Sequence, residues 1–207
     1  MDALTRERYR EAMSSPASRA QRIGLLGGSF NPPHEGHREI SVAALDWLKL
    51  DAVWWLVSPA SPLKDVAAYA PYEERLAKAR ALARHAQIVV SDFERRRALQ
   101  YTVDTIAALR DTAPDTHFVW LMGADSLASV HRWKDWRRIF LLAPVAVFNR
   151  PGFEGAALSS PAATEFAAFR LEASEALADA EPPAWAFFAG TENPLSSTAI
   201  RERPGRP

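Results

Sequence analysis

Short apolar runs alternate with stretches of helical periodicity along most of the chain, and this alternation constrains the fold more than any other feature. The candidate buried strands are residues 23–26, 52–57, 88–90, 117–122, 144–148 and 185–188. The chain has no long segment of alternating polar and apolar residues, which is the mark of strands exposed on one face. The pattern predicts an α/β fold: a Rossmann-like, doubly wound parallel sheet of five to six strands with helices on both faces.

The helices expected between these strands differ in how clearly they are marked. The first follows Asn31-Pro32-Pro33, and the others are expected at 72–84, 102–110, 164–178 and 198–202. The Ala-rich region 156–180 is interpreted as a loop followed by a solvated helix, and Arg95 to Arg97 as a solvated loop because acidic residues flank them. The polar stretch 1–21 is expected to be a flexible leader or one short helix, and 22–207 a single domain.

Composition narrows the classes of partner. Twenty-five basic residues balance 25 acidic ones in a chain of 207 residues, so nothing draws the whole molecule to nucleic acid or to an acidic membrane. There is no cysteine, which excludes disulfides, thiolate metal sites and a thiol nucleophile. No apolar run approaches the roughly 20 residues that span a bilayer. These features predict a cytoplasmic protein without a membrane or nucleic-acid partner, and they leave its oligomeric state open.

Residues 27–37, Gly-Gly-Ser-Phe-Asn-Pro-Pro-His-Glu-Gly-His, join the first predicted strand to the first predicted helix. Glycines at the end of a strand let a ligand approach the backbone, and the free amides of the following helix attract an anion. His34 and His37 are three residues apart, so both rings can face the same side of the helix. Such a pair could stabilise charge on a phosphoryl group in transfer, although histidines at a helix start can also cap the helix or bind a metal.

This segment resembles the GGxFDPxHxGH signature of the nucleotidylyltransferase superfamily, with His34-Glu35-Gly36-His37 as its HxGH box. Residues 196–201, Ser-Ser-Thr-Ala-Ile-Arg, resemble the ISSTxIR motif, whose hydroxyls, amides and arginine hold the β and γ phosphates of ATP. The planar guanidinium of Arg201 matches phosphate oxygens.

Further segments resemble one branch of that superfamily, the nicotinate-nucleotide adenylyltransferases. They are the Pro-rich stretch 59–64 ending in Lys64, Glu94 with Tyr-Thr-Val-Asp-Thr at 101–105, Gly-Ala-Asp-Ser-Leu at 123–127, Trp133 with Trp136, and Arg-Pro-Gly at 150–152. The resemblance covers the chain from about Arg22 to Arg201. It implies transfer of the adenylyl group of ATP to nicotinic acid mononucleotide, a step of NAD biosynthesis.

The resemblance also implies roles for individual residues. Catalytic roles fall on His34, His37 and Arg201. Contacts with ATP fall on Gly27, Gly28, Ser29, Phe30, Gly123, Asp125, Ser197 and Thr198. Contacts with the acceptor fall on Lys64, Thr102, Trp133 and Lys134. The carboxylate of Asp125 would meet the ribose hydroxyls, Lys64 would approach a phosphate, and Trp133 would stack on the pyridine ring. Mg²⁺ would arrive with ATP, because the sequence offers no dedicated carboxylate cage for it.

Plainer interpretations stand beside these roles. The two tryptophans could be packing residues, Asp125 could be a helix N-cap, and Asp104 is expected to support structure. Two positions depart from the family pattern: Asn31 stands where an aspartate is usual, and Leu63 where a histidine is common. Alternative acceptors are nicotinamide mononucleotide and phosphopantetheine, and the alternative outside enzymes is a nucleotide-binding sensor.

Overall fold

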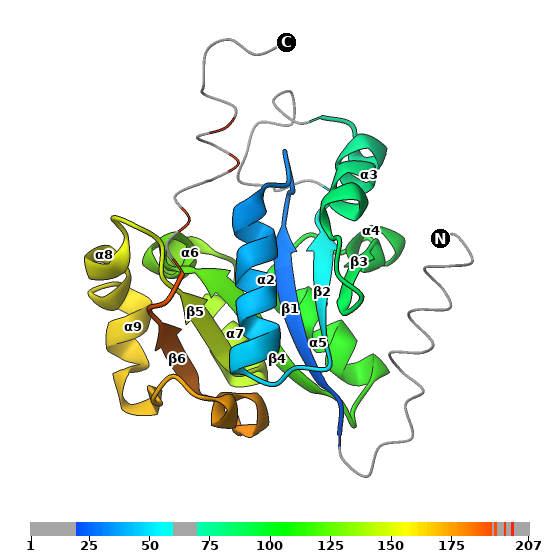
Figure 1. Cartoon of the computed structure of the whole chain (residues 1–207). Helices are drawn as coiled ribbons and strands as arrows, with labels where there is room; N and C mark the ends of the chain where they lie inside the picture. Colours follow the sequence, from blue (N-terminus) through cyan, green and yellow to red (C-terminus); the bar gives the residue numbers. More distant parts are fainter. Residues whose placement is uncertain (1–19, 60–69, 192, 194–196, 198–199, 201–207) are drawn as a thin grey trace.

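The computed structural model describes residues 20–59, 70–191, 193, 197 and 200, and its centre is a parallel sheet of six strands in the order β3-β2-β1-β4-β5-β6 (Figure 1). The strands are β1 (Arg22–Gly28), β2 (Ala52–Val57), β3 (Ile88–Ser91), β4 (His117–Gly123), β5 (Val145–Phe148) and β6 (Trp185–Phe188). All five neighbouring pairs are parallel. The predicted α/β class and parallel sheet are confirmed. The strand order reverses at β1 and β4, which is where doubly wound sheets open a crevice for ligands.

Helices cover both faces of this sheet. The α-helices are α2 (Glu35–Trp47), α3 (Tyr72–Leu82), α4 (Phe93–Arg96), α5 (Thr102–Thr112), α6 (Ala124–Ser129), α7 (Trp136–Leu142), α8 (Glu154–Leu158) and α9 (Pro161–Glu165). Short 3₁₀ turns are η2 (Val130–Arg132), η3 (Ala167–Phe169) and η4 (Glu175–Asp179). One face packs against α2 and α3, and the other against α4 to α7 and α9. Figure 1 shows α2 in front of the sheet and α5 behind it.

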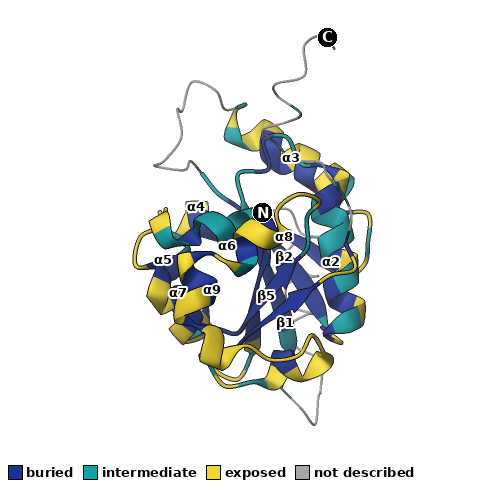
Figure 2. Ribbon diagram, turned by 90° about the vertical axis from the view of Figure 1, so that its left-hand side faces the viewer, coloured by how far each residue is buried: buried dark blue, intermediate teal, exposed yellow. Residues whose placement is uncertain are grey.

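The strands are buried on both sides, as their unbroken apolar runs require. Trp54 and Trp55 are neighbours in β2, and their side chains point to opposite faces. Trp54 belongs to the same apolar cluster as Ile106 of α5, whereas Trp55 belongs to the cluster that contains Leu48. Figure 2 shows the strands as a buried layer between helices whose outer surfaces are exposed. Burial of each large apolar side chain contributes roughly 1.5–3 kcal/mol, so these two layers supply the main stabilisation of the fold.

The continuous helix expected at 164–178 is wrong. Helix α9 ends at Glu165, and the chain then forms η3 and η4 with irregular backbone between them. The cause is a tertiary contact: the carbonyl of Phe166 accepts a hydrogen bond from the indole of Trp185 at 2.8 Å, and the amide of Leu171 donates to the carbonyl of Trp185. The chain therefore leaves the helix to run beside β6. The loop expected before that helix is also wrong, because the chain forms α8 and α9 there and buries Ala157, Ala162 and Ala163, whereas residues 167–176 are exposed as expected.

The solvated loop expected at Arg95 to Arg97 is instead the short helix α4 and the residue that follows it. The guanidinium of Arg95 forms an ion pair with Glu73, and that of Arg96 with Asp92 at 2.8 Å. The arginines are exposed, as expected, but Glu94 beside them is buried.

The remaining predictions about chain organisation can be compared with the structure only in part. The leader up to residue 19 and most of the final helix at 198–202 lie outside the described residues. None of the described helices combines the length and the apolar character that crossing a bilayer demands.

Candidate active site

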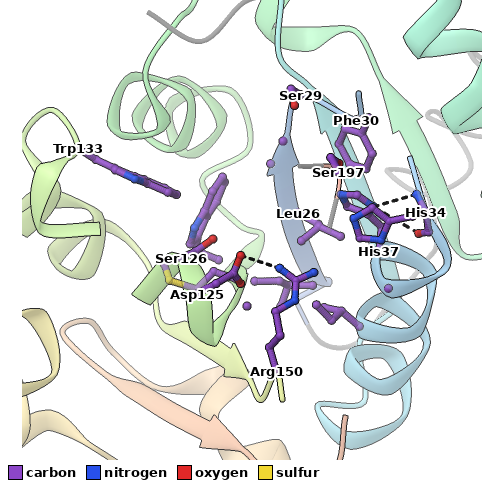
Figure 3. A pocket seen from close by; sticks show the side chains of 18 residues that line it. Leu26, Ser29, Phe30, His34, His37, Asp125, Ser126, Trp133, Arg150 and Ser197 are labelled. Atoms are coloured by element: carbon purple, nitrogen blue, oxygen red, sulfur yellow. Dashed lines mark hydrogen bonds and ion pairs between the residues drawn. The ribbon is translucent and has the colours of Figure 1, made fainter. Parts of the chain in front are cut away.

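A cavity opens at the carboxyl ends of β1 and β4, the point where the strand order reverses (Figure 3). Its described lining comprises Leu26, Gly27, Gly28, Ser29, Phe30, His34, Gly36, His37, Ile40, Trp120, Leu121, Met122, Gly123, Asp125, Ser126, Trp133, Arg150 and Ser197. Twelve of the predicted site residues are described, and ten of them line this cavity. The sheet topology thus gathers residues that are far apart in the sequence.

Two glycines of the cavity are approached closely by other side chains. A Cβ on Gly27 would lie 2.4 Å from the ring of Trp120, and a Cβ on Gly123 would lie 2.5 Å from Oδ1 of Asp125. Gly27 is the penultimate residue of β1, and Gly123 is the last residue of β4. Their absence of a side chain keeps the cavity floor open at the strand ends and lets a ligand approach the backbone.

The two histidines lie at the start of α2 with ring centroids 3.9 Å apart. The backbone amide of His34, the N-cap residue, donates to Nδ1 of His37 at 3.2 Å. Nδ1 of His37 also lies 3.3 Å from the carbonyl oxygen of His34, so its role depends on the tautomer; the tautomer that accepts from the amide carries its proton on Nε2. Nδ1 of His34 is buried and has no hydrogen-bond partner among the described residues. The pair therefore keeps donor and acceptor capacity for a ligand.

An aromatic stack fixes the orientation of these rings. Phe30 lies 4.6 Å from the ring of His37 and 5.1 Å from that of Trp55, centroid to centroid. The indole of Trp55 donates to the hydroxyl of Ser41 at 2.7 Å, and that hydroxyl donates to the carbonyl of His37 at 2.7 Å. Phe30 is fully buried and is held at a positive φ of 48°. The predicted ATP residue Phe30 thus lies behind the histidines and supports them.

Both histidines are neutral near pH 7. Burial, with a smaller effect from the charge of Arg150, lowers the pKa of His34 to about 4. Burial, followed by the proximity of His34, lowers the pKa of His37 to about 3. Desolvation disfavours the charged imidazolium in each case.

Arg150 extends into the cavity from the segment after β5 and donates to Oδ2 of Asp125 at 2.6 Å (Figure 3). The alternative that Asp125 is an N-cap is wrong, because Gly123 is the N-cap residue of α6. The Arg-Pro-Gly segment belongs to the family resemblance, but the roles implied by that resemblance do not include this arginine. The signal in the sequence is an arginine two residues after a predicted parallel strand, since the carboxyl ends of such strands meet at one edge of the sheet.

The two ends of the sequence meet at this cavity. The hydroxyl of Ser197 donates to the carbonyl of Pro32 at 2.9 Å, although 165 positions separate them. Ser197 lines the cavity beside the histidine pair. Thr198 and Arg201, the other predicted residues of this motif, lie outside the described residues.

The residues predicted to bind the acceptor do not all line the cavity. Trp133 lines the cavity, whereas Trp136 is buried in the core, where the packing interpretation is confirmed. Thr102 begins α5 and is not among the lining residues. Nζ of Lys134 lies 3.3 Å from a carboxylate oxygen of Asp104, in agreement with the structural role expected for that aspartate. Lys64 lies outside the described residues.

Comparison with known proteins fits this geometry. A family model described as Cytidylyltransferase-like matches residues 25–203. A probable nicotinate-nucleotide adenylyltransferase of Methylorubrum extorquens is 51% identical over 184 residues, which are 88% of this chain and 100% of that protein. A relative of the same description from Cereibacter sphaeroides is 52% identical over 179 residues, 86% of this chain and 96% of that one. The chain belongs to the nicotinate-nucleotide adenylyltransferase family.

Solved structures agree in fold with this family. The Plasmodium falciparum nicotinic acid mononucleotide adenylyltransferase complexed with NaAD aligns with a TM-score of 0.64 at 16% identity, over 88% of this chain and 83% of that one. The family and enzyme class predicted from the motifs are confirmed by the close relatives. Members of nucleotidyltransferase families typically use a divalent metal ion together with the nucleotide.

Proposed function

We propose that this member of the nicotinate-nucleotide adenylyltransferase family uses the described cavity to transfer the adenylyl group of ATP to nicotinic acid mononucleotide. The products are nicotinic acid adenine dinucleotide and pyrophosphate. The observation that carries the proposal is the convergence of the histidine pair, Ser197 and the Asp125–Arg150 pair on one cavity where the strand order reverses.

The reaction is a direct in-line displacement. A phosphate oxygen of the mononucleotide attacks the α-phosphorus of ATP, the new P–O bond forms, and the bond to the bridging oxygen of pyrophosphate breaks. The electron pair of that bond leaves with pyrophosphate. Such a step needs no covalent nucleophile from the protein, so catalysis rests on alignment and on charge stabilisation. Alignment of two reactants is worth roughly 7–11 kcal/mol of the barrier.

The histidine pair would hold the transferring phosphoryl group. In the tautomer whose Nδ1 accepts from the backbone amide of His34, Nε2–H of His37 is available to donate. A donor that points at the position where negative charge develops lowers the barrier without reorganisation during the reaction. Gly27 and Gly28 would let the phosphates approach the backbone beside Ser29.

The nucleotide would extend from the histidines towards Asp125. Its carboxylate suits the ribose hydroxyls, and Gly123 leaves room for them. Ser197, with Thr198 and Arg201 as predicted from the sequence, would hold the pyrophosphate that leaves. Arg150 is the described cation of the cavity, and its place beside Asp125 makes it a further candidate for contact with ATP.

The acceptor would lie against Trp133, whose ring can stack on the pyridine. Thr102 and the backbone around Trp133 and Lys134 would receive the nicotinate carboxylate, and Lys64 a phosphate. Lys134 also lies over the ring of Tyr101 at 4.4 Å, so its charge is close to the start of α5.

We infer that the metal ion is Mg²⁺ bound through the phosphates of ATP. Within the described residues no three His, Cys, Asp or Glu side chains form a group that could hold an ion, and Asp125 is engaged by Arg150. Mg²⁺ would screen the charge of the triphosphate. The chain's own residues would then only need to hold the nucleotide.

Pyrophosphate release from ATP and Mg²⁺ tests the proposal, with nicotinic acid mononucleotide, nicotinamide mononucleotide or phosphopantetheine offered separately. Rapid release with the acid alone, lost in His37→Ala, would support the reaction and the site. His117→Ala is the matched control, because His117 begins β4 at the end of the sheet opposite the cavity and is exposed. Preference for another acceptor would contradict the substrate, and ATP binding without release would favour the sensor.

A further inference from the structure

Arg75 is a charged side chain that is almost completely buried, with 1% of its surface exposed, and it does not line the cavity. Its guanidinium donates to four main-chain carbonyl oxygens. Nε donates to Ala70 at 3.1 Å, Nη1 to Ser58 at 2.9 Å and to Ser29, and Nη2 to Pro59 at 2.7 Å. A buried guanidinium is costly unless its donors are satisfied, and these four acceptors use most of its five N–H groups.

The four carbonyls come from three segments that the sequence separates. Ser29 follows β1 in the predicted ATP loop, Ser58 and Pro59 follow β2, and Ala70 comes just before α3. The ladder between β1 and β2 ends with the amide of Ser58 donating to the carbonyl of Gly28 at 2.9 Å. Beyond this point the segments that follow β1 and β2 no longer pair with each other, and the guanidinium supplies hydrogen bonds in place of the ladder.

A second contact fastens the same segments. Oδ1 of Asn31 accepts from the amide of Ala70 at 3.2 Å, while the carbonyl of Ala70 accepts from Arg75. Asn31 is buried and lies three residues before His34. The loop that leads to the histidine pair is therefore joined to Ala70 both by the side chain of Asn31 and through Arg75.

The arginine itself has little freedom. It lies on α3, and its guanidinium carbon is 5.3 Å from the ring centroid of Tyr72, whose hydroxyl donates to the carbonyl of Val57 at 3.3 Å. A planar fork with donors in fixed directions can reach acceptors on several sides at once. A lysine ammonium carries three donors at a single point and cannot reproduce that arrangement.

We propose that Arg75 is a positioning residue for adenylyl transfer: by holding Ser29, Ser58, Pro59 and Ala70 it sets the spacing between the ATP loop and the chain that follows β2. This inference rests on the proposed function, since the chain after β2 leads to the stretch that the sequence predicts to contact the acceptor. Its consequence is that Arg75 acts on the alignment of the two substrates without touching either of them. A misplacement of about 1 Å between reacting groups can cost on the order of 10²-fold in rate.

The test compares Arg75→Lys and Arg75→Ala with Lys78→Ala, which removes an exposed cation from the same helix. Circular dichroism and thermal unfolding give the folded fraction at the assay temperature, and turnover is expressed per folded molecule. We expect kcat to fall on the order of 10²-fold in both Arg75 variants, with little change in the Kd for ATP measured by calorimetry. Lys78→Ala should keep the natural kcat.

Chemical rescue separates positioning from a purely structural role. Millimolar guanidinium ion should raise the kcat of Arg75→Ala, because the free ion can occupy the space between the four carbonyls. It should do nothing for the natural protein or for Lys78→Ala.

Different experimental results would overturn the positioning role of Arg75 and the proposed function. If the natural protein releases no pyrophosphate with any acceptor, the proposed function fails. If it turns over normally and folded Arg75→Lys keeps the natural kcat, the positioning role of Arg75 is overturned. Should Arg75→Ala not fold, Arg75→Lys decides the question alone.

Discussion

Glu94→Gln should make the protein more stable at alkaline pH and slightly less stable at acid pH. Glu94 is 5% exposed, and its carboxylate accepts from the hydroxyl of Thr105 at 3.0 Å and hydrogen-bonds the Ser58 side chain. Burial raises its pKa from 4.5 to about 7, and the two hydroxyls only partly offset this effect. The folded state therefore binds the proton of Glu94 more tightly than the unfolded chain does.

The sign and size follow from that difference. As pH rises from 4.5 to 7, the unfolded chain releases the proton first, so the free energy of unfolding decreases over this window. Above the window the ionised carboxylate costs the folded state about 3 kcal/mol, since each tenfold change in acidity is worth about 1.4 kcal/mol. Glutamine has no charge to bury and loses about 1 kcal/mol of hydrogen bonding, which leaves a gain of about 2 kcal/mol.

Urea unfolding of both proteins at several pH values between about 4.5 and 8 measures this gain, which corresponds to a rise in Tm of roughly 4–8 °C at the alkaline end. His34 and His37 also titrate with unfolding, but they are present in both proteins and cancel in the difference. Glu154→Gln, an exposed carboxylate at the start of α8, is the control and should show no such trend. A difference between Glu94→Gln and the natural protein that is the same at both ends of the pH range would refute the reasoning.

Three further predictions concern the cavity itself. His37→Ala should lower kcat on the order of 10²–10³-fold, as loss of one preorganised donor does in other enzymes, with intact folding by circular dichroism. Gly27→Ala should destabilise the fold by about 1–3 kcal/mol, because its Cβ would lie 2.4 Å from the ring of Trp120; Gly27→Ala combined with Trp120→Phe should recover part of that loss in thermal unfolding. Asp125→Asn should raise the KM for ATP more than that for the acceptor, since it weakens the expected ribose contact and the pairing with Arg150; equal changes in both constants would contradict the assignment.

The sheet could be predicted from the sequence because parallel strands that are buried on both faces appear as continuous apolar runs. All six runs became strands, and each observed boundary lies within about two residues of the expected one. The segment 164–178 could not be predicted in the same way. Its composition favours a helix, but the bond from the indole of Trp185 to the carbonyl of Phe166 decides its path, and that bond depends on the position of β6.

Site residues that lie together in a short motif could be predicted from the sequence. Those brought together only by the arrangement of the strands could not. The histidine pair and the glycines are close in sequence, so their convergence needs only one strand and one helix. Arg150 meets Asp125 because β4 and β5 are neighbours, which a list of elements does not reveal. Arg75 is harder still: it follows two glutamates near the start of α3, where it would pass for a solvated helix charge, and only the tertiary structure buries it.

The described residues around the cavity present little net positive charge to it. Arg150 is the cation among the described lining residues, and it is paired with Asp125. His34 and His37 are neutral near pH 7, because burial lowers the pKa of each. A phosphate that enters beside them favours their charged forms and competes with Asp125 for the guanidinium. If ATP binds as proposed, we expect its phosphate to raise the pKa of both histidines and to weaken the pairing of Arg150, so the positive potential should increase where the transferring group would be held.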